Sequence, residues 1–183
     1  MADDPRVRHV AHSLVRWQWP DGGWNCDSSE DARHSSFYES LATLWGLSEY
    51  LRATNDDSVR TAVDRAAELF LNHRLFRSCH GNEVMDPRWT RLHYPVYWHY
   101  DILQALRVLD RAGKLGDPRA REALDLIQSK RAKDGTWSVE GRFWHPGPVH
   151  AANTEVVDWG GAGPNEMITL NALRVLAASG RDS

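Results

Sequence analysis

The chain has 183 residues, a formal net charge of −3, 42% hydrophobic residues and 26% charged residues. This composition excludes a disordered chain, and acids and bases are interspersed without the basic stripe that a nucleic-acid partner requires. No apolar run is long enough to span a membrane, and the two cysteines, Cys26 and Cys79, follow no leader-like segment. We therefore expect one domain, residues 1–183, in a reducing cytoplasm.

The first 24 residues contain a segment that is repeated later in the chain. Residues 4–24 align with residues 117–137 without a gap, and the two copies share the start Asp-Pro-Arg and the end Asp-Gly-x-Trp. In both copies we expect Asp to cap a helix, Pro to occupy its first position and Asp-Gly to reverse the chain. Helices are thus predicted at 5–18 and 118–131, and the amphipathic segment 58–74 is a third helix of this type.

Leucines at three-residue steps indicate a second type of helix. They stand at Leu41, Leu44 and Leu47, at Leu103, Leu106 and Leu109, and at Leu170, Leu173 and Leu176, so the ladders recur at similar intervals along the chain. We predict helices at 36–53, 97–112 and 164–178. Because the two types alternate, the six helices form three helical hairpins, and the fold is all-α. The long connections 75–96 and 138–163 are expected to carry function.

The turn after the first helix is similar to a known repeat. Gln18-Trp19-Pro20-Asp21-Gly22-Gly23-Trp24 resembles the QW motif of squalene and oxidosqualene cyclases, which is related to the repeats of protein prenyltransferase β subunits, and Asp134-Gly135-Thr136-Trp137 is a weaker copy. The stretches GGWNCD…HSSFYESL and YPVYWHYDILQALRVL also resemble bacterial prenyltransferase and squalene-oxidase repeat proteins. In such a turn we expect the tryptophan to cover the end of its own hairpin and to fasten it to the next one.

This resemblance implies an α/α toroid. The leucine-ladder helices would be the inner helices around a central cavity, and three hairpins would form a partial ring, half of one at most. The chain departs from the family in its acidic motifs, because it contains neither the Asp-x-Asp-Asp of class II cyclases nor the Asp-Asp-x-x-Asp of class I terpene synthases. Catalysis is therefore an open question for the sequence.

Polar and aromatic residues precede the leucine ladders. Inner helices of a toroid point their N-termini at one mouth of the cavity, so we expect these residues to converge there. The predicted acid/base residues are Asp101, His99 and Glu39, since Glu39 and Asp101 hold equivalent places ahead of the first two ladders. The predicted ligand-binding residues are Tyr38, His93, Tyr97, Trp98, Tyr100, Asn165 and Glu166.

The same residues have a simpler structural interpretation. Acids in the first turn of a helix interact favourably with its dipole and cap its free amides. Aromatic side chains next to a helix also serve to anchor a loop in the core. The arginines around the first long connection are either a phosphate or carboxylate site or a solvated charged loop; they are Arg74, Arg77, Arg88 and Arg91.

Three functional hypotheses follow. The leading one is a terpenoid-cyclase-like or prenyltransferase-like domain that binds a small apolar, isoprenoid-like ligand in an aromatic cavity, without a cofactor, and acts on it by proton transfer. The alternative is a noncatalytic binding or assembly domain whose half ring pairs with a second copy, as a homodimer, or with another domain. The third is a zinc site at Cys26, Asp27 and His34, with His99 near them, although the family's Asp-x-Cys order is absent.

Overall fold

The computed structural model describes residues 2, 4–29, 31–143, 157 and 159–181, and these are mainly helical. The helices are α1 (Pro5–Arg16), α2 (Phe37–Thr54), α3 (Arg60–Asn72), α4 (Ile102–Arg111), α5 (Arg121–Ser129) and α6 (Glu166–Ala178), with 3-10 turns η1 (Asp57–Val59), η2 (Pro87–Thr90) and η3 (Pro118–Ala120). Two short antiparallel strands, β1 (Ser138–Val139) and β2 (Gly163–Pro164), pair ahead of α6. For this part of the chain, the all-α prediction is confirmed. None of its helices has the length and apolarity that a membrane crossing requires.

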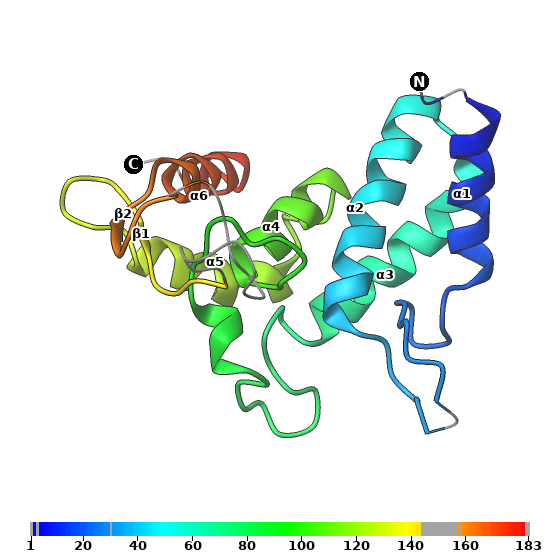
Figure 1. Cartoon of the computed structure of the whole chain (residues 1–183), viewed down its shortest axis with the longest axis horizontal. Helices are drawn as coiled ribbons and strands as arrows, with labels where there is room; N and C mark the ends of the chain where they lie inside the picture. Colours follow the sequence, from blue (N-terminus) through cyan, green and yellow to red (C-terminus); the bar gives the residue numbers. More distant parts are fainter. Residues whose placement is uncertain (1, 3, 30, 144–156, 158, 182–183) are drawn as a thin grey trace.

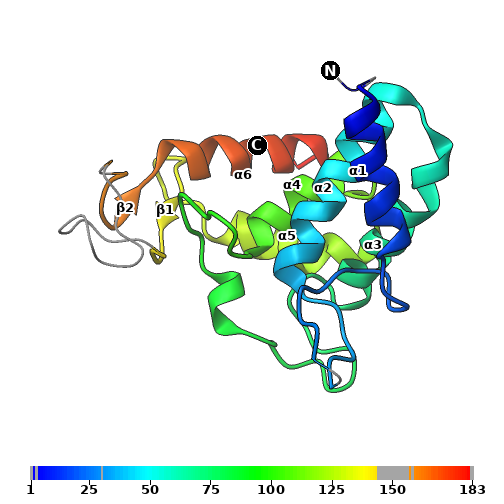
Figure 2. The same ribbon diagram turned by 45° about the vertical axis from the view of Figure 1, so that its right-hand side comes forward.

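The two predicted types of helix occupy different places. The ladder helices contact one another in the order α2, α4, α6, while α1 and α3 pack against α2, and α5 packs against α4 and α6. Figure 1 shows α1, α2 and α3 on one side of the molecule, α5 and α6 on the other, and α4 between them; Figure 2 gives a second view of this order. Because it touches both α2 and α6, α4 is the centre of the core. Its buried residues are Ile102, Leu103, Gln104, Ala105, Leu106, Val108 and Leu109.

The ladder helices pack in the register of their repeat. The guanidinium of Arg107 lies over the ring of Trp45, 5.5 Å from its centroid. One turn further on, Nε of Arg111 lies 3.4 Å from a carboxylate oxygen of Glu49. Both pairs have the same separation in the sequence as the first two leucine ladders. Because a step of one turn along α2 is matched by a step of one turn in the same direction along α4, the two helices run parallel. On the other side, Arg107 and Arg174, which are related by the offset between the second and third ladders, line one pocket.

The leucine ladders differ in burial. Those of α2 and α4 are buried throughout, with no ladder leucine more than 8% exposed. In α6, Leu176 is 5% exposed, but Leu170 and Leu173 are 39% and 43% exposed. The third ladder is therefore only partly buried. The reason is position: α6 is last in the row, and no helix of the described chain covers its far side.

The repeated tryptophans make the same hydrogen bond in both copies. Nε1–H of Trp24 donates to the carbonyl of Leu14 at 2.8 Å, and Nε1–H of Trp137 donates to the carbonyl of Ile127 at 2.7 Å. Both indoles are buried, so each one ties the turn to the helix that precedes it. A buried indole with its N–H satisfied is the arrangement expected of a structural tryptophan.

The link to the neighbouring hairpin comes from Gln18. Its amide donates to the carbonyls of Gly22 and Ala62 at 2.7 and 2.8 Å, and its oxygen accepts from Arg65 at 3.0 Å. Ala62 and Arg65 belong to α3, so the glutamine joins α1 to α3. In the second copy, Arg131 stands in the place of Gln18 and lies over the ring of its own Trp137.

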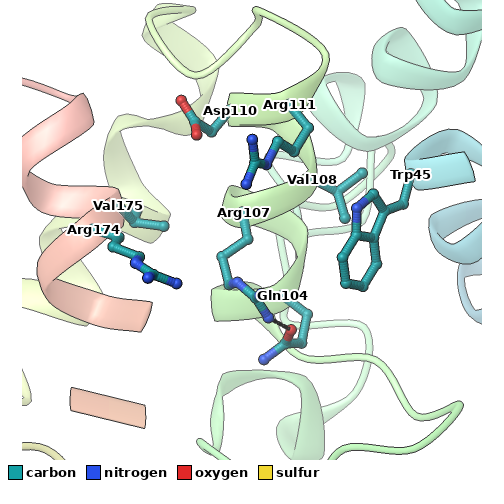
Figure 3. A pocket seen from close by; sticks show the side chains of 8 residues that line it. All are labelled: Trp45, Gln104, Arg107, Val108, Asp110, Arg111, Arg174 and Val175. Atoms are coloured by element: carbon teal, nitrogen blue, oxygen red, sulfur yellow. Dashed lines mark hydrogen bonds between the residues drawn. The ribbon is translucent and has the colours of Figure 1, made fainter. Parts of the chain in front are cut away.

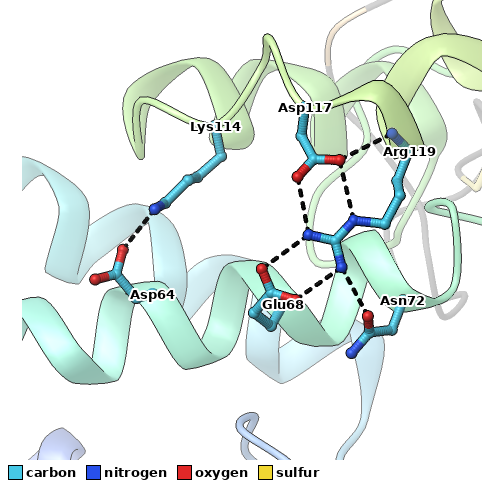
Figure 4. A network of polar contacts seen from close by, with 6 residues as sticks. All are labelled: Asp64, Glu68, Asn72, Lys114, Asp117 and Arg119. Carbon is cyan, nitrogen blue, oxygen red and sulfur yellow. Dashed lines mark hydrogen bonds and ion pairs between the residues drawn. The ribbon is translucent and has the colours of Figure 1, made fainter.

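A network of charged side chains links α3 to the start of α5 (Figure 4). Nη1 of Arg119 bonds to Glu68 at 2.7 Å, and Nη2 bonds to Asp117 at 2.8 Å. Lys114 pairs with Asp64 at 2.8 Å. The hydrogen bond from Arg119 lowers the pKa of Glu68. These pairs are partly exposed, so they position η3 more than they stabilise the fold.

The tight turn of the first repeat predicts a sharp difference between two glycines. Gly22 has φ +99, and a Cβ there would lie 2.5 Å from the carbonyl oxygen of Arg65. Gly22→Ala should therefore lower the free energy of unfolding by more than about 1 kcal/mol. Gly46, within α2, has no heavy atom within 4 Å of such a Cβ, so Gly46→Ala should raise it by about 1 kcal/mol. Urea denaturation measures both, and changes of the same sign would contradict the turn.

Candidate functional site

The start of α4 differs from the prediction. The helix begins at Ile102 rather than at residue 97, because Asp101 is its N-cap: Oδ1 accepts a hydrogen bond from the backbone N–H of Gln104 at 2.9 Å. The residues before the cap form a loop in which Tyr97 has φ +49. This loop carries most of the predicted site residues.

Several predicted site residues meet in one group of stacked rings, which we call the histidine–aromatic cluster. Tyr38 of α2 lies 5.4 Å from Trp98 and 6.2 Å from His99, measured between ring centroids. His99 stacks on Phe143 at 3.5 Å, and Phe143 also stacks on His93 at 4.2 Å. The cluster therefore joins α2, the loop before α4 and the segment after β1. Phe143 was not predicted, because nothing in its local sequence distinguishes it.

The aromatic residues of the α4 loop differ in exposure. Trp98 and Tyr97 are 68% and 50% exposed, so both offer surface to a ligand. Tyr100 is 1% exposed and its hydroxyl donates to the carbonyl of Leu75 at 2.5 Å. Its position is that of a core residue that anchors the first long connection.

Asp101 is enclosed together with His93. Their side chains are 1% and 4% exposed, and Nδ1 of His93 lies 3.8 Å from Oδ2 of Asp101, beyond hydrogen-bond distance. Neither of these two atoms has a hydrogen-bond partner among the described residues. One carboxylate oxygen of Asp101 thus caps the helix, and the other faces the imidazole of His93. A fully buried carboxylate of this kind does not touch a ligand at the surface.

The other two predicted acid/base residues are proton acceptors at neutral pH. Burial acts to raise the pKa of Glu39, but hydrogen bonds from Cys26 and Ser36 outweigh it and lower the pKa. The Cys26 thiol donates to Glu39 at 2.9 Å. Burial, and after it the charge of His93, lower the pKa of His99. An ionised carboxylate and a neutral imidazole are suited to accept a proton rather than to donate one.

The predicted residues at the start of α6 serve that helix. Asn165 is its N-cap, and the side-chain oxygen accepts from the N–H groups of Met167 and Ile168 at 3.1 and 3.0 Å. Glu166 is an exposed acid in the first turn, where it complements the helix dipole. Neither one joins the histidine–aromatic cluster through a contact of the described residues.

Two of the residues proposed for zinc, Cys26 and Asp27, are engaged in local hydrogen bonds through their side chains. The carboxylate of Asp27 accepts from the N–H of Ser29 at 2.9 Å, and Cys26 bonds to Glu39. Within residues 4–29, 31–143 and 159–181, no three histidine, cysteine, aspartate or glutamate side chains lie where they could hold a metal ion. Nothing in this region supports the zinc hypothesis.

A pocket between α2, α4 and α6 was not predicted. Figure 3 shows Trp45 projecting from α2, Arg107 from α4 and Arg174 from α6 into the same space. These three residues hold the same position in their repeats, because they are separated by the same offsets as the leucine ladders. The whole lining consists of Trp45, Gln104, Arg107, Val108, Asp110, Arg111, Arg174 and Val175. The ladder offsets are the signal that could have revealed the pocket, since they align these positions as well as the leucines.

Arg107 lies at the centre of this pocket. It is half-buried, and its Nη1 donates to the side-chain oxygen of Gln104 at 2.5 Å. Burial, followed by the positive charge of Arg174, lowers the pKa of Arg107. The charge of Asp101 acts in the opposite direction, but it does not outweigh burial and the neighbouring cation.

Comparison of the chain with family models, curated proteins and solved structures gave no match. The resemblance to the QW repeat therefore rests on the motif.

The capping role of Asp101 can be tested with two substitutions. Asp101→Ala leaves the N–H of buried Gln104 without its acceptor, and should lower the free energy of unfolding by about 1–3 kcal/mol. Asp101→Asn keeps an oxygen at the cap and should retain most of the stability. Chemical denaturation distinguishes the two. If asparagine is as damaging as alanine, the negative charge, and not the cap, is what matters.

Proposed function

We propose that the chain is a partial α/α toroid that binds a small, isoprenoid-like ligand on the exposed side of α2, α4 and α6. We call this side the three-helix face; it comprises Tyr38, Trp45, Gln104, Arg107, Arg111, Met167, Leu170 and Arg174. The observation that carries the proposal is that equivalent repeat positions of the three ladder helices line one pocket. In a toroid, these positions face the central cavity.

The three-helix face combines aromatic and aliphatic groups. On α2, Tyr38 precedes Trp45 by two helical turns, so both project from the same side of the helix. On α6, Met167 and Leu170, each 39% exposed, precede Arg174 by two turns and one turn and share its side. At 1.5 Å per residue, Tyr38 and Trp45 are separated by about 10 Å along the helix. An extended apolar molecule of that length fits such a surface.

The geometry favours binding over proton-transfer chemistry. Protonation of an alkene needs an acid in contact with the ligand, whereas Asp101 is enclosed and the pKa values of Glu39 and His99 are lowered. Ligand binding without proton transfer is therefore the role that the residues support best. Aromatic rings at Tyr38 and Trp98 would contribute contact area without charge.

A second candidate, assembly with another copy, is supported by the two ends of the helix row. At one end, an apolar groove between α1 and α2 is lined by Val7, Val10, Ala11, Leu14, Gly46, Leu47 and Tyr50, beside Arg6. At the other end, Leu173 of α6 is exposed. Within the chain, the ladder helix α4 packs against both helices of the α5–α6 hairpin. The α1–α2 hairpin is the equivalent unit of the first repeat, and its groove corresponds to the surface that α4 covers on α5 and α6. Helix α6 of a second copy would fill this groove and continue the row of ladder helices.

The assembly candidate predicts a dimer that depends on the exposed leucine of α6. Light scattering should give twice the chain mass, and Leu173→Glu should shift the molecule to a monomer without lowering its helix content, because the side chain is 43% exposed. Arg121→Glu, a change at another exposed position, on α5, is the control. A wild-type chain that stays monomeric at high concentration would rule this candidate out.

The ligand-binding proposal is tested with farnesol as the probe. Equilibrium dialysis should show saturable binding, and Trp98→Ala should weaken it about fivefold, as expected for loss of roughly 1 kcal/mol of aromatic contact. Trp17→Ala is the matched control, because Trp17 and Trp98 are 66% and 68% exposed and Trp17 lies at the end of α1. Absence of saturable binding, or equal effects of the two substitutions, would argue against the proposal.

A further inference from the structure

The pocket of the three-helix face has an imbalance of charge. Arg107 and Arg174 contribute two guanidinium groups from neighbouring helices. The described chain gives Arg107 one hydrogen-bond partner, the neutral side chain of Gln104. Arg174 has no hydrogen bond and no ion pair within the part of the chain that the structure describes. The two guanidinium groups are close enough to repel each other, since the charge of Arg174 contributes to lowering the pKa of Arg107.

Several other arginines of the described chain are paired with a carboxylate. Those with a carboxylate partner at 4 Å or less include Arg6, Arg60, Arg77, Arg88, Arg119 and Arg181. Two of them, Arg77 and Arg88, belong to the first long connection, where the sequence indicates either an anion site or a solvated loop; they bind Glu122 and Asp86 instead. The pair in the pocket differs from an exposed unpaired arginine in that Arg107 is half-buried and lies close to a second guanidinium, that of Arg174.

The acids near the pocket offset this imbalance only in part, since the charge of Asp101 acts to raise the pKa of Arg107 but does not outweigh burial and Arg174. Glu49 faces Arg111 at 3.4 Å, so this carboxylate is already engaged. Asp110 lines the pocket, but no hydrogen bond or ion pair joins its side chain to another described residue. Holding two like charges side by side in a partly buried pocket costs free energy unless an anion lies between them.

We propose that Arg107 and Arg174 bind an anionic head group, a carboxylate or a phosphate, of the ligand whose apolar part lies along the three-helix face. This inference rests on the proposed function and specifies its ligand as an amphiphile. Two guanidinium forks from separate helices match the oxygens of such a group. The N–H groups of the Gln104 amide add donors, since its oxygen is the atom that Arg107 occupies.

The position of the pocket sets the direction of the ligand. Trp45 lies against Arg107 at 5.5 Å and covers one side of the guanidinium. From there, Tyr38 lies two turns back toward the N-terminus of α2, and Met167 lies at the corresponding end of α6. The head group would thus lie at the middle of the ladder helices, and the apolar part would extend toward the histidine–aromatic cluster. Aromatic surface at Trp98 and Tyr38 is continuous there.

The test compares farnesol with farnesoic acid, which differs from it by carrying a carboxylate. At pH 7 and low salt, the wild-type chain should bind farnesoate at least tenfold more tightly than farnesol. Farnesyl monophosphate, measured alongside, distinguishes a phosphate site from a carboxylate site by the larger of the two preferences. The preference should fall as salt is raised, because a partly exposed ion pair is screened.

Substitutions identify the groups responsible. Arg174→Gln, at an exposed side chain, should reduce the preference for farnesoate over farnesol at least fivefold. Arg107→Gln should act in the same direction. The control is Arg8→Gln, which removes another exposed arginine, from α1 and away from the pocket. Circular dichroism confirms that each variant folds, and Arg174→Gln decides the matter if Arg107→Gln does not fold.

Each outcome has a separate meaning. The head-group site is overturned, and the proposed function left standing, if the wild-type chain binds farnesol and farnesoate equally. The same holds if the preference survives Arg174→Gln or falls equally in Arg8→Gln. Failure of all three probes to bind overturns both proposals. A preference lost in Arg174→Gln and kept in Arg8→Gln supports the inference.

Discussion

The parallel packing of α2, α4 and α6 in a common register is the constraint on which the rest of the structure depends. The ladder helices touch at positions that are related by the offsets of their leucine ladders, so an equivalent residue of each repeat meets its counterparts. Two kinds of local contact connect the elements around these helices. The buried indoles of Trp24 and Trp137 tie each turn to the helix before it, and Gln18 carries the link from α1 to α3.

The ladder helices repeat the same backbone arrangement, but the side chains at their equivalent exposed positions differ. At one equivalent position, the three ladder helices carry an indole, Trp45, and two guanidiniums, Arg107 and Arg174. Packing requires only that the buried side of each helix be apolar, so it leaves the exposed side free to differ. That difference, and not the fold, is what gives the three-helix face an apolar part and a cationic part, and function is accordingly argued from the face.

Sequence patterns predicted the elements better than they predicted the site. Helix caps such as Asp4, the turn glycines and the ladder periodicity are local signals, and they were enough to predict the six helices of the described residues. The start of α4 was misplaced because Tyr97 and its neighbours have helical spacing, while their backbone follows the capping of Asp101. The burial of Asp101 and the convergence of Arg107 with Arg174 depend on contacts between distant segments, which no local pattern encodes.

The register of α2 against α4 is tested most directly by an engineered metal bridge. Glu49→His combined with Arg111→His places two imidazoles where the native atoms lie 3.4 Å apart. If the helices pack as described, Ni²⁺ at 100 times its Kd should raise the free energy of unfolding of the double variant by about 2.7 kcal/mol, while either single variant responds little. A double variant that Ni²⁺ stabilises no more than the single variants do would contradict the shared register and, with it, the three-helix face.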